Sequence, residues 1–150
     1  MILFFSEGIN FNLKNRSLYK RWIKDIICEY QKGAQPKKPG EINIIFCNDD
    51  FLLSINNQYL KHNYYTDIIT FDYSDNQYIN GDLYISIDSV KNNSEKFKTE
   101  FFNELSRVII HGILHLSGFN DHTEKEKIEM RINEDHALSK LPGELHVKRM

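Results

Sequence analysis

The segment TEFFNELSRVIIHGILHLSGFNDH, residues 99 to 122, combines a helical apolar pattern with three histidines. With about 100° of rotation per helical residue, its apolar side chains share one side of the helix. These are Phe102, Leu105, Ile109, Ile113 and Leu116. The opposite side holds Glu104, Arg107, His111 and His115. The pattern predicts a central amphipathic helix from about Thr99 to Ser117, with its apolar side toward a core.

The two histidines of this helix are spaced for metal binding. Residues four apart on a helix are neighbours, so the imidazoles of His111 and His115 can reach one ion. Gly118 stands where the apolar periodicity ends, and glycine readily adopts the left-handed conformation that stops a helix. Such a turn sends the chain back and allows a third ligand from Asp121 or His122. We therefore predict a metal site at the end of the central helix.

A zinc protease is a poor interpretation of this site. In the protease pattern H-E-x-x-H, a glutamate after the first histidine serves as the general base. Gly112 occupies that position here. The predicted site therefore lacks the base on which this protease chemistry depends.

The remaining chain predicts short strands mixed with helices. We expect strands over residues 2–8 and 41–48, and a hairpin that pairs residues 67–73 with 82–88. Residues 32–40 should form a polar loop. One helix should run from Asn15 or Ser17 to about Tyr30, and a second from a cap at Asp49 or Asp50 to residue 60. Two or three helices fill the rest. Because strands cluster early and helices late, the sequence favours one α+β domain over residues 1–150, a small mixed sheet of about four strands covered by helices.

Composition narrows the functional class. The 150 residues are 41% hydrophobic and 27% charged, with a formal net charge of −2, which argues against a generally basic nucleic-acid binder. No apolar stretch approaches the roughly 20 residues that span a bilayer. Cys28 and Cys47 are too few for a disulfide framework, so we expect buried thiols in a reducing cytoplasm.

Several motifs together resemble one known family. HGILHLSGFNDH resembles the H-G-x-L-H-L-x-G-Y-D-H signature of the YbeY family, which comprises bacterial ribosomal RNA maturation factors regarded as zinc-dependent endoribonucleases. NNQYLKHNYYTDIITF resembles that family's N-x-x-Y-R followed by T-D-V-L-S-F, and GDLYIS resembles its G-D-x-x-I-S. Glu104 precedes His111 by seven residues, as in the family. The resemblance is strong over about residues 40 to 140.

The resemblance implies a function on RNA. It implies a single-strand-specific endoribonuclease with one zinc ion, acting on ribosomal RNA and ribosomal particles in late maturation of the 16S rRNA 3′ end and in ribosome quality control. The alternative is a non-catalytic assembly factor whose zinc ion stabilises the fold. A closed site with four ligands would favour that alternative.

This chain departs from the family pattern at two positions. The family's arginine, which can bind phosphate, falls on Leu60, and the adjacent Lys61 and His62 are candidate substitutes in substrate binding. One residue is added after Gly118, so the family's third histidine falls on Asp121. The register of the turn favours Asp121 as the third ligand, and carboxylates do bind zinc. A one-residue bulge would instead bring His122 into place.

Three further residues are candidates for supporting roles in the site. Glu104 lies on the histidine side of the helix, where it can orient an imidazole through its other ring nitrogen, or can be an ordinary solvated charge. Thr66 and Asp67 match a family motif, which implies a place beside the cleft. Their alternative role is to cap the entry of a strand.

Overall fold

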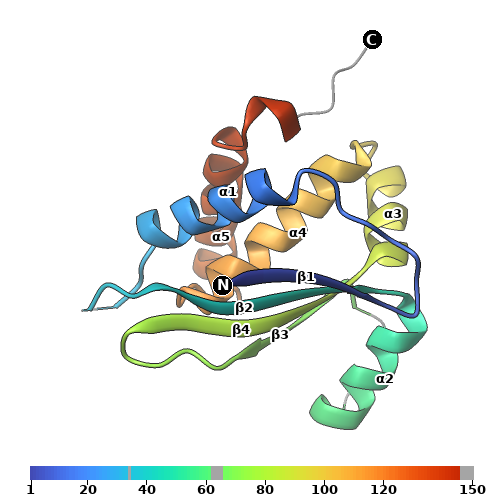
Figure 1. Ribbon diagram of the computed structural model, residues 1–150, viewed down its shortest axis with the longest axis horizontal. Coiled ribbons are helices and arrows are strands. Elements are labelled where there is room, and N and C mark those ends of the chain that lie inside the picture. Colours follow the sequence, from blue (N-terminus) through green and yellow to red (C-terminus); the bar gives the residue numbers. More distant parts are fainter. Residues whose placement is uncertain (34, 62–65, 146–150) are drawn as a thin grey trace.

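The computed structural model describes residues 1–33, 35–61 and 66–145. These residues form a four-stranded mixed sheet in the order β1-β2-β4-β3 (Figure 1). Its strands are β1 (Ile2–Glu7), β2 (Lys38–Cys47), β3 (Ile68–Asp72) and β4 (Tyr78–Ser86). β1, β2 and β4 are parallel, whereas β3 pairs antiparallel with β4 and forms one edge of the sheet. The predicted α+β class is confirmed.

Helices cover one face of the sheet almost entirely (Figure 1). The helices on this face are α1 (Arg16–Glu29), α3 (Ile87–Lys96), α4 (Phe101–Leu116) and α5 (Glu124–Ser139). Helix α2 (Asp49–Leu60) lies on the other face, where it contacts β3 and β4. A short 3-10 turn, Gly143–Leu145, follows α5. In the described ranges, none of the helices has the length and apolarity that a bilayer crossing requires.

Helix α4 is the centre of the core. Leu105, Ile109 and Ile113 are fully buried, as the wheel pattern predicts. Val108, Ile110, Gly112 and Leu114 are buried as well. Burial extends around the helix because α4 contacts β3 and β4 of the sheet and also the helices α1, α3 and α5.

Gly112 allows α4 to approach the sheet closely. A Cβ atom at this position would lie 2.6 Å from Cδ2 of Leu83 on β4 and 2.8 Å from Cδ1 of Ile68 on β3. Heavy-atom contacts this short cannot be accommodated without moving the neighbours. Gly112 is therefore a packing requirement, and a protease-type glutamate has no room at this position.

Several element boundaries differ from the sequence-based expectation, among them those of β4, which runs from Tyr78 to Ser86 and not over residues 82–88. Helix α2 is capped by Asn48, whose side chain accepts a hydrogen bond from the Phe51 N–H at 2.8 Å, and not by Asp49 or Asp50. Asp49 instead accepts from the Ser89 hydroxyl at 2.6 Å. Strand β2 begins at Lys38, inside the predicted polar loop, because β4 provides a pairing partner as far as Tyr78.

Two burial predictions were wrong. Phe102 is 38% exposed, because it lies in the first turn of α4, beyond the part of the helix that the core encloses. Cys28 is exposed near the end of α1, whereas Cys47 is fully buried at the end of β2. The core side of α1 is occupied by larger apolar residues, among them Trp22 and Ile26.

Candidate metal centre

The end of α4 and the turn after it bring three metal-binding side chains together. Gly118 has a φ of 101°, and its N–H donates to the His115 carbonyl at 3.0 Å. The next N–H, that of Phe119, donates to the Leu114 carbonyl at 3.0 Å. These bonds end the helix in the left-handed turn that glycine favours. The chain reverses, and Asp121 returns to the histidine side of α4.

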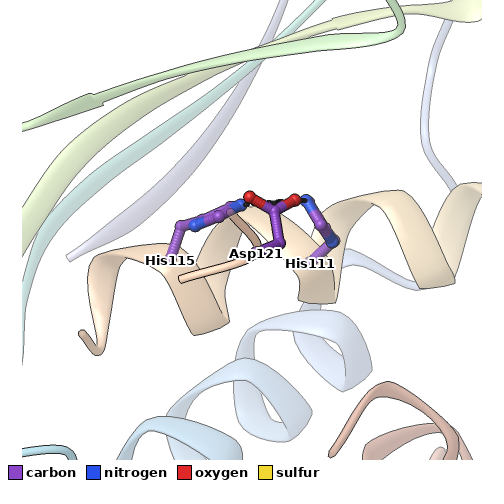
Figure 2. Close-up of side chains that lie close together, drawn as sticks. All are labelled: His111, His115 and Asp121. Carbon is purple, nitrogen blue, oxygen red and sulfur yellow. Dashed lines mark hydrogen bonds and ion pairs between the residues drawn. The ribbon is translucent and has the colours of Figure 1, made fainter. Parts of the chain in front are cut away.

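The side chains of His111, His115 and Asp121 point toward one another (Figure 2). The Nε2 atoms of the two imidazoles are 3.0 Å apart. One Asp121 oxygen, Oδ2, lies 3.4 Å from Nε2 of His111 and 3.5 Å from Nε2 of His115. Tetrahedral zinc with bonds near 2.05 Å separates its ligand atoms by about 3.3 Å. The three donor atoms fit such an ion, so the cluster could hold a metal.

His122 lies outside this group. Its side chain is exposed, although the residue borders the cleft beside the cluster. The turn at Gly118 was expected to favour Asp121 over His122 as the third ligand. In the structure, Asp121 faces the two histidines, in agreement with that expectation.

Glu134 on α5 binds the far side of the His111 ring. Its Oε2 atom lies 2.7 Å from Nδ1 of His111, and its Oε1 atom accepts from Nη1 of Arg107 at 2.9 Å. The second Arg107 nitrogen, Nη2, donates to Asp135 at 2.7 Å. Glu134, and not the predicted Glu104, is therefore the carboxylate in contact with the His111 ring. Glu104 instead accepts a long hydrogen bond, 3.5 Å, from the Thr99 hydroxyl.

Sequence reasoning missed Glu134, although the sequence carries a signal for it. The buried residues of α5 are Met130, Glu134 and Ala137, which follow the spacing of an apolar helical stripe. A carboxylate on such a stripe needs a polar partner, because an unpaired buried charge is strongly unfavourable. The identity of that partner depends on how α5 packs against α4, which one helix pattern does not reveal.

Burial and the neighbouring charges shift the pKa values of His111, Glu134 and His115. Burial opposes a charge on His111, but the hydrogen bond and negative charge of Glu134 outweigh it and raise the pKa of this imidazole. Burial likewise disfavours ionised Glu134, yet His111 and Arg107 lower the pKa of its carboxyl. For His115, burial and the nearby His111 lower the pKa, which favours the neutral imidazole that binds metals.

The cluster opens into a cleft of about 650 Å³ along the edge strand β3. The cleft is lined by residues of α2, β3, α4 and the turn after α4: Asn56, Leu60, Thr66, Asp67, Ile68, Ile69, Thr70, Asp72, His111, His115, Asp121 and His122. Thr66 and Asp67 thus border the cleft. Burial raises the pKa of the Asp67 carboxyl, partly offset by the charge of His111.

The position of the family's arginine lies on the wall of this cleft. Leu60 is 41% exposed and ends helix α2. Lys61, a predicted substitute, is exposed and has a left-handed backbone (φ 55°), but is not among the residues lining the cleft. His62, the other predicted substitute, lies outside the described residues.

Comparison with known proteins identifies the family. Residues 8–142 match the family model described as Endoribonuclease YbeY. Proteins named Endoribonuclease YbeY from Azobacteroides pseudotrichonymphae and Parabacteroides distasonis are 49% and 46% identical, over 93% and 95% of this chain and 97% of each relative. The solution structure of a Thermotoga maritima protein is similar, with a TM-score of 0.65 and 27% identity over 96% of this chain and 91% of that one. The chain belongs to the YbeY family.

Proposed function

We propose that this protein is a metal-dependent endoribonuclease that cleaves single-stranded RNA during ribosomal RNA maturation. The observation that carries the proposal is the opening of the His111, His115 and Asp121 cluster into a cleft of about 650 Å³. The relatives named Endoribonuclease YbeY share nearly half of its residues and support a reaction on RNA. Cleavage of the 16S rRNA 3′ end and quality control of ribosomal particles are the specific tasks that we propose.

We assign one zinc ion to this cluster, with His111, His115 and Asp121 as its ligands. Two imidazoles and a carboxylate are an accepted zinc donor set, and three protein ligands are typical of catalytic sites. A zinc ion held by these residues would act as a Lewis acid, which would activate water and neutralise phosphate charge. The lowered pKa of His115 favours its neutral form, Glu134 contacts His111 through Nδ1, and the Nε2 atoms of both rings face Asp121, where the ion would be held.

The cleft walls bind the substrate in this proposal. Thr66 and Asp67 lie immediately before β3, and the Thr66 hydroxyl donates to the Ile68 carbonyl at 3.4 Å. Leu60 offers no hydrogen bond to a phosphate, and the described residues that line the cleft include neither lysine nor arginine. An unpaired strand suits the site, because its backbone can bend to bring one phosphate to the cluster.

A non-catalytic zinc-stabilised assembly factor is the weaker candidate. It requires a closed site, with a fourth protein ligand in place of water. Among the residues that the structure describes, the cluster has three members, and His122 is exposed.

A ribosomal RNA substrate also implies a cytoplasmic protein that contacts ribosomal particles, which we include in the proposal.

The test is cleavage of an RNA oligonucleotide blocked at both ends, as a single strand and as a matched duplex. The protein is stripped of metal with a chelator and then reloaded with zinc. We expect internal cuts in the single strand by the reloaded protein, little cutting of the duplex, and none by a folded His111→Ala variant. Cutting by the stripped protein or by His111→Ala at the rate of the reloaded protein would contradict the proposal.

A further inference from the structure

The Glu134 carboxylate is the most completely engaged polar group beside the metal cluster. Glu134 is 5% exposed, and each of its oxygens has its own partner. Oε1 accepts from Nη1 of Arg107 at 2.9 Å, and Oε2 lies 2.7 Å from Nδ1 of His111. The contact links two helices, because Arg107 and His111 lie one turn apart on α4 and Glu134 lies on α5.

This arrangement fixes which nitrogen of His111 carries the proton. An ionised carboxylate only accepts hydrogen bonds, so Nδ1 of His111 must be the donor. A neutral ring protonated at Nδ1 has its lone pair on Nε2. That atom is the one directed toward His115 and Asp121, at 3.0 and 3.4 Å. Glu134 thus holds the ring in the tautomer and orientation that a metal ligand requires.

Arg107 determines which oxygen of Glu134 is available to His111. Its Nη1 occupies Oε1, so the carboxylate cannot rotate to present both oxygens to the imidazole. The guanidinium also bonds Asp135, but that carboxylate is 58% exposed and does not contact His111. Exposed ion pairs contribute little, commonly about 0–1 kcal/mol. The buried bond to Glu134 is therefore the one that orients the carboxylate.

We infer that Glu134 and Arg107 are positioning residues for the metal site, with Glu134 fixing the His111 ring and Arg107 fixing Glu134. This inference rests on the proposed function, because it concerns the same zinc ion. It adds two residues of α4 and α5 to the three proposed ligands. Carboxylate partners of metal-binding histidines in other proteins change metal affinity by about 10- to 100-fold.

The test compares Glu134→Gln with Asp135→Asn, two nearly isosteric changes on adjacent residues that both contact Arg107. A glutamine has one acceptor oxygen, so it cannot serve both Arg107 and His111. We expect the zinc affinity of Glu134→Gln, measured by competition with a chelator, to fall about 10- to 100-fold. Asp135→Asn should bind zinc like the wild type. Nitrogen NMR of the zinc-free proteins, at a pH high enough for the His111 ring to be neutral, should show His111 protonated at Nδ1 in the wild type and a mixture of tautomers in Glu134→Gln.

The possible outcomes separate this inference from the proposed function. A wild-type protein that binds no zinc would overturn the proposed metal site. Zinc binding by the wild type and equally by Glu134→Gln, with an unchanged His111 tautomer, would overturn only the positioning role. Equal losses of zinc affinity in Glu134→Gln and Asp135→Asn would also overturn it, because they would reflect a general disturbance of the packing of α5. If Glu134→Gln does not fold, Arg107→Lys is the second variant. It should weaken zinc binding, and unchanged affinity would refute the inference.

Discussion

Asp121 changes the charge of the candidate metal site. A carboxylate in place of a third imidazole lowers the net charge of a loaded site by one elementary charge, while keeping a donor that zinc accepts. The histidine pair and the following glycine turn were predictable from spacing alone, since both are properties of one helix and its end. The sequence left Asp121 and His122 both open as third ligands, whereas in the structure Asp121, and not His122, lies with the two histidines.

The first prediction separates the two candidate third ligands. Asp121→Ala removes the oxygen that lies 3.4 and 3.5 Å from the two Nε2 atoms, so we expect loss of zinc binding. His122→Ala changes an exposed side chain beside the same cleft, so zinc should remain near one equivalent. Elemental analysis of the purified proteins measures both. Full zinc content in Asp121→Ala, or loss in His122→Ala, would reverse the assignment.

The second prediction concerns the cleft wall at Leu60. Leu60→Arg places a guanidinium where the family pattern has one. In other enzymes, one preorganised hydrogen-bond donor raises the rate about 100- to 1,000-fold. We expect faster cleavage of single-stranded RNA with unchanged zinc content. Leu60→Lys is the matched control, because it adds the charge without the two-pronged geometry and should accelerate less. Unchanged kcat/KM in Leu60→Arg would show that position 60 does not contact the reacting phosphate.

At the scale of single elements, helix and strand patterns predicted most of the fold. The pairing of β3 with β4 and the position of α4 are confirmed, because both follow from local periodicity, whereas β4 begins at Tyr78 and ends at Ser86 instead of covering residues 82–88. The cap of α2 and the start of β2 were not predictable in detail. Asn48, Asp49 and Asp50 are all suitable caps, and the backbone path decides among them. Glu134 was missed because its partners belong to another helix.

The third prediction tests the close approach of α4 to the sheet. Gly112→Ala places a Cβ 2.6 Å from the fully buried Leu83 side chain. Overpacking of this kind costs about 1–3 kcal/mol, whereas alanine gains up to about 1 kcal/mol in helix propensity. The free energy of unfolding in urea should therefore fall. Gly143→Ala is the control, since nothing lies within 4 Å of its Cβ position, and should change stability by less than about 0.5 kcal/mol. A Gly112→Ala protein as stable as the wild type would contradict the packing role.

At the scale of the whole molecule, the order of strands and helices along the chain predicted the class of fold, but not which side chains reach the surface. Cys28 and Cys47 illustrate this limit. Both were expected to be buried, yet α1 directs Cys28 to solvent while the sheet encloses Cys47. The local sequence does not reveal whether a cysteine side chain is buried or exposed. The exposure of Cys28 follows from the way α1 packs against the sheet.

The fourth prediction uses this difference between the thiols. Burial, with the charges of Asp49 and Asp88, raises the pKa of the Cys47 thiol to about 12, so it carries little of the reactive thiolate near neutral pH. The folded protein should react with one equivalent of a thiol reagent, at Cys28, and with two after denaturation in guanidinium. Mass spectrometry of the labelled peptides locates the modification. Rapid labelling of Cys47 in the folded protein would contradict the enclosed core.

The central claim is that one metal ion at the His111, His115 and Asp121 cluster enables cleavage of RNA, and a titration tests it most directly. Metal-stripped protein is titrated with zinc while internal cleavage of a single-stranded RNA is followed. We predict that the cleavage rate rises from the stripped baseline and reaches a plateau at one equivalent of zinc. His115→Ala should stay at the baseline throughout. A rate independent of zinc, or a plateau shared by the wild type and His115→Ala, would contradict the account.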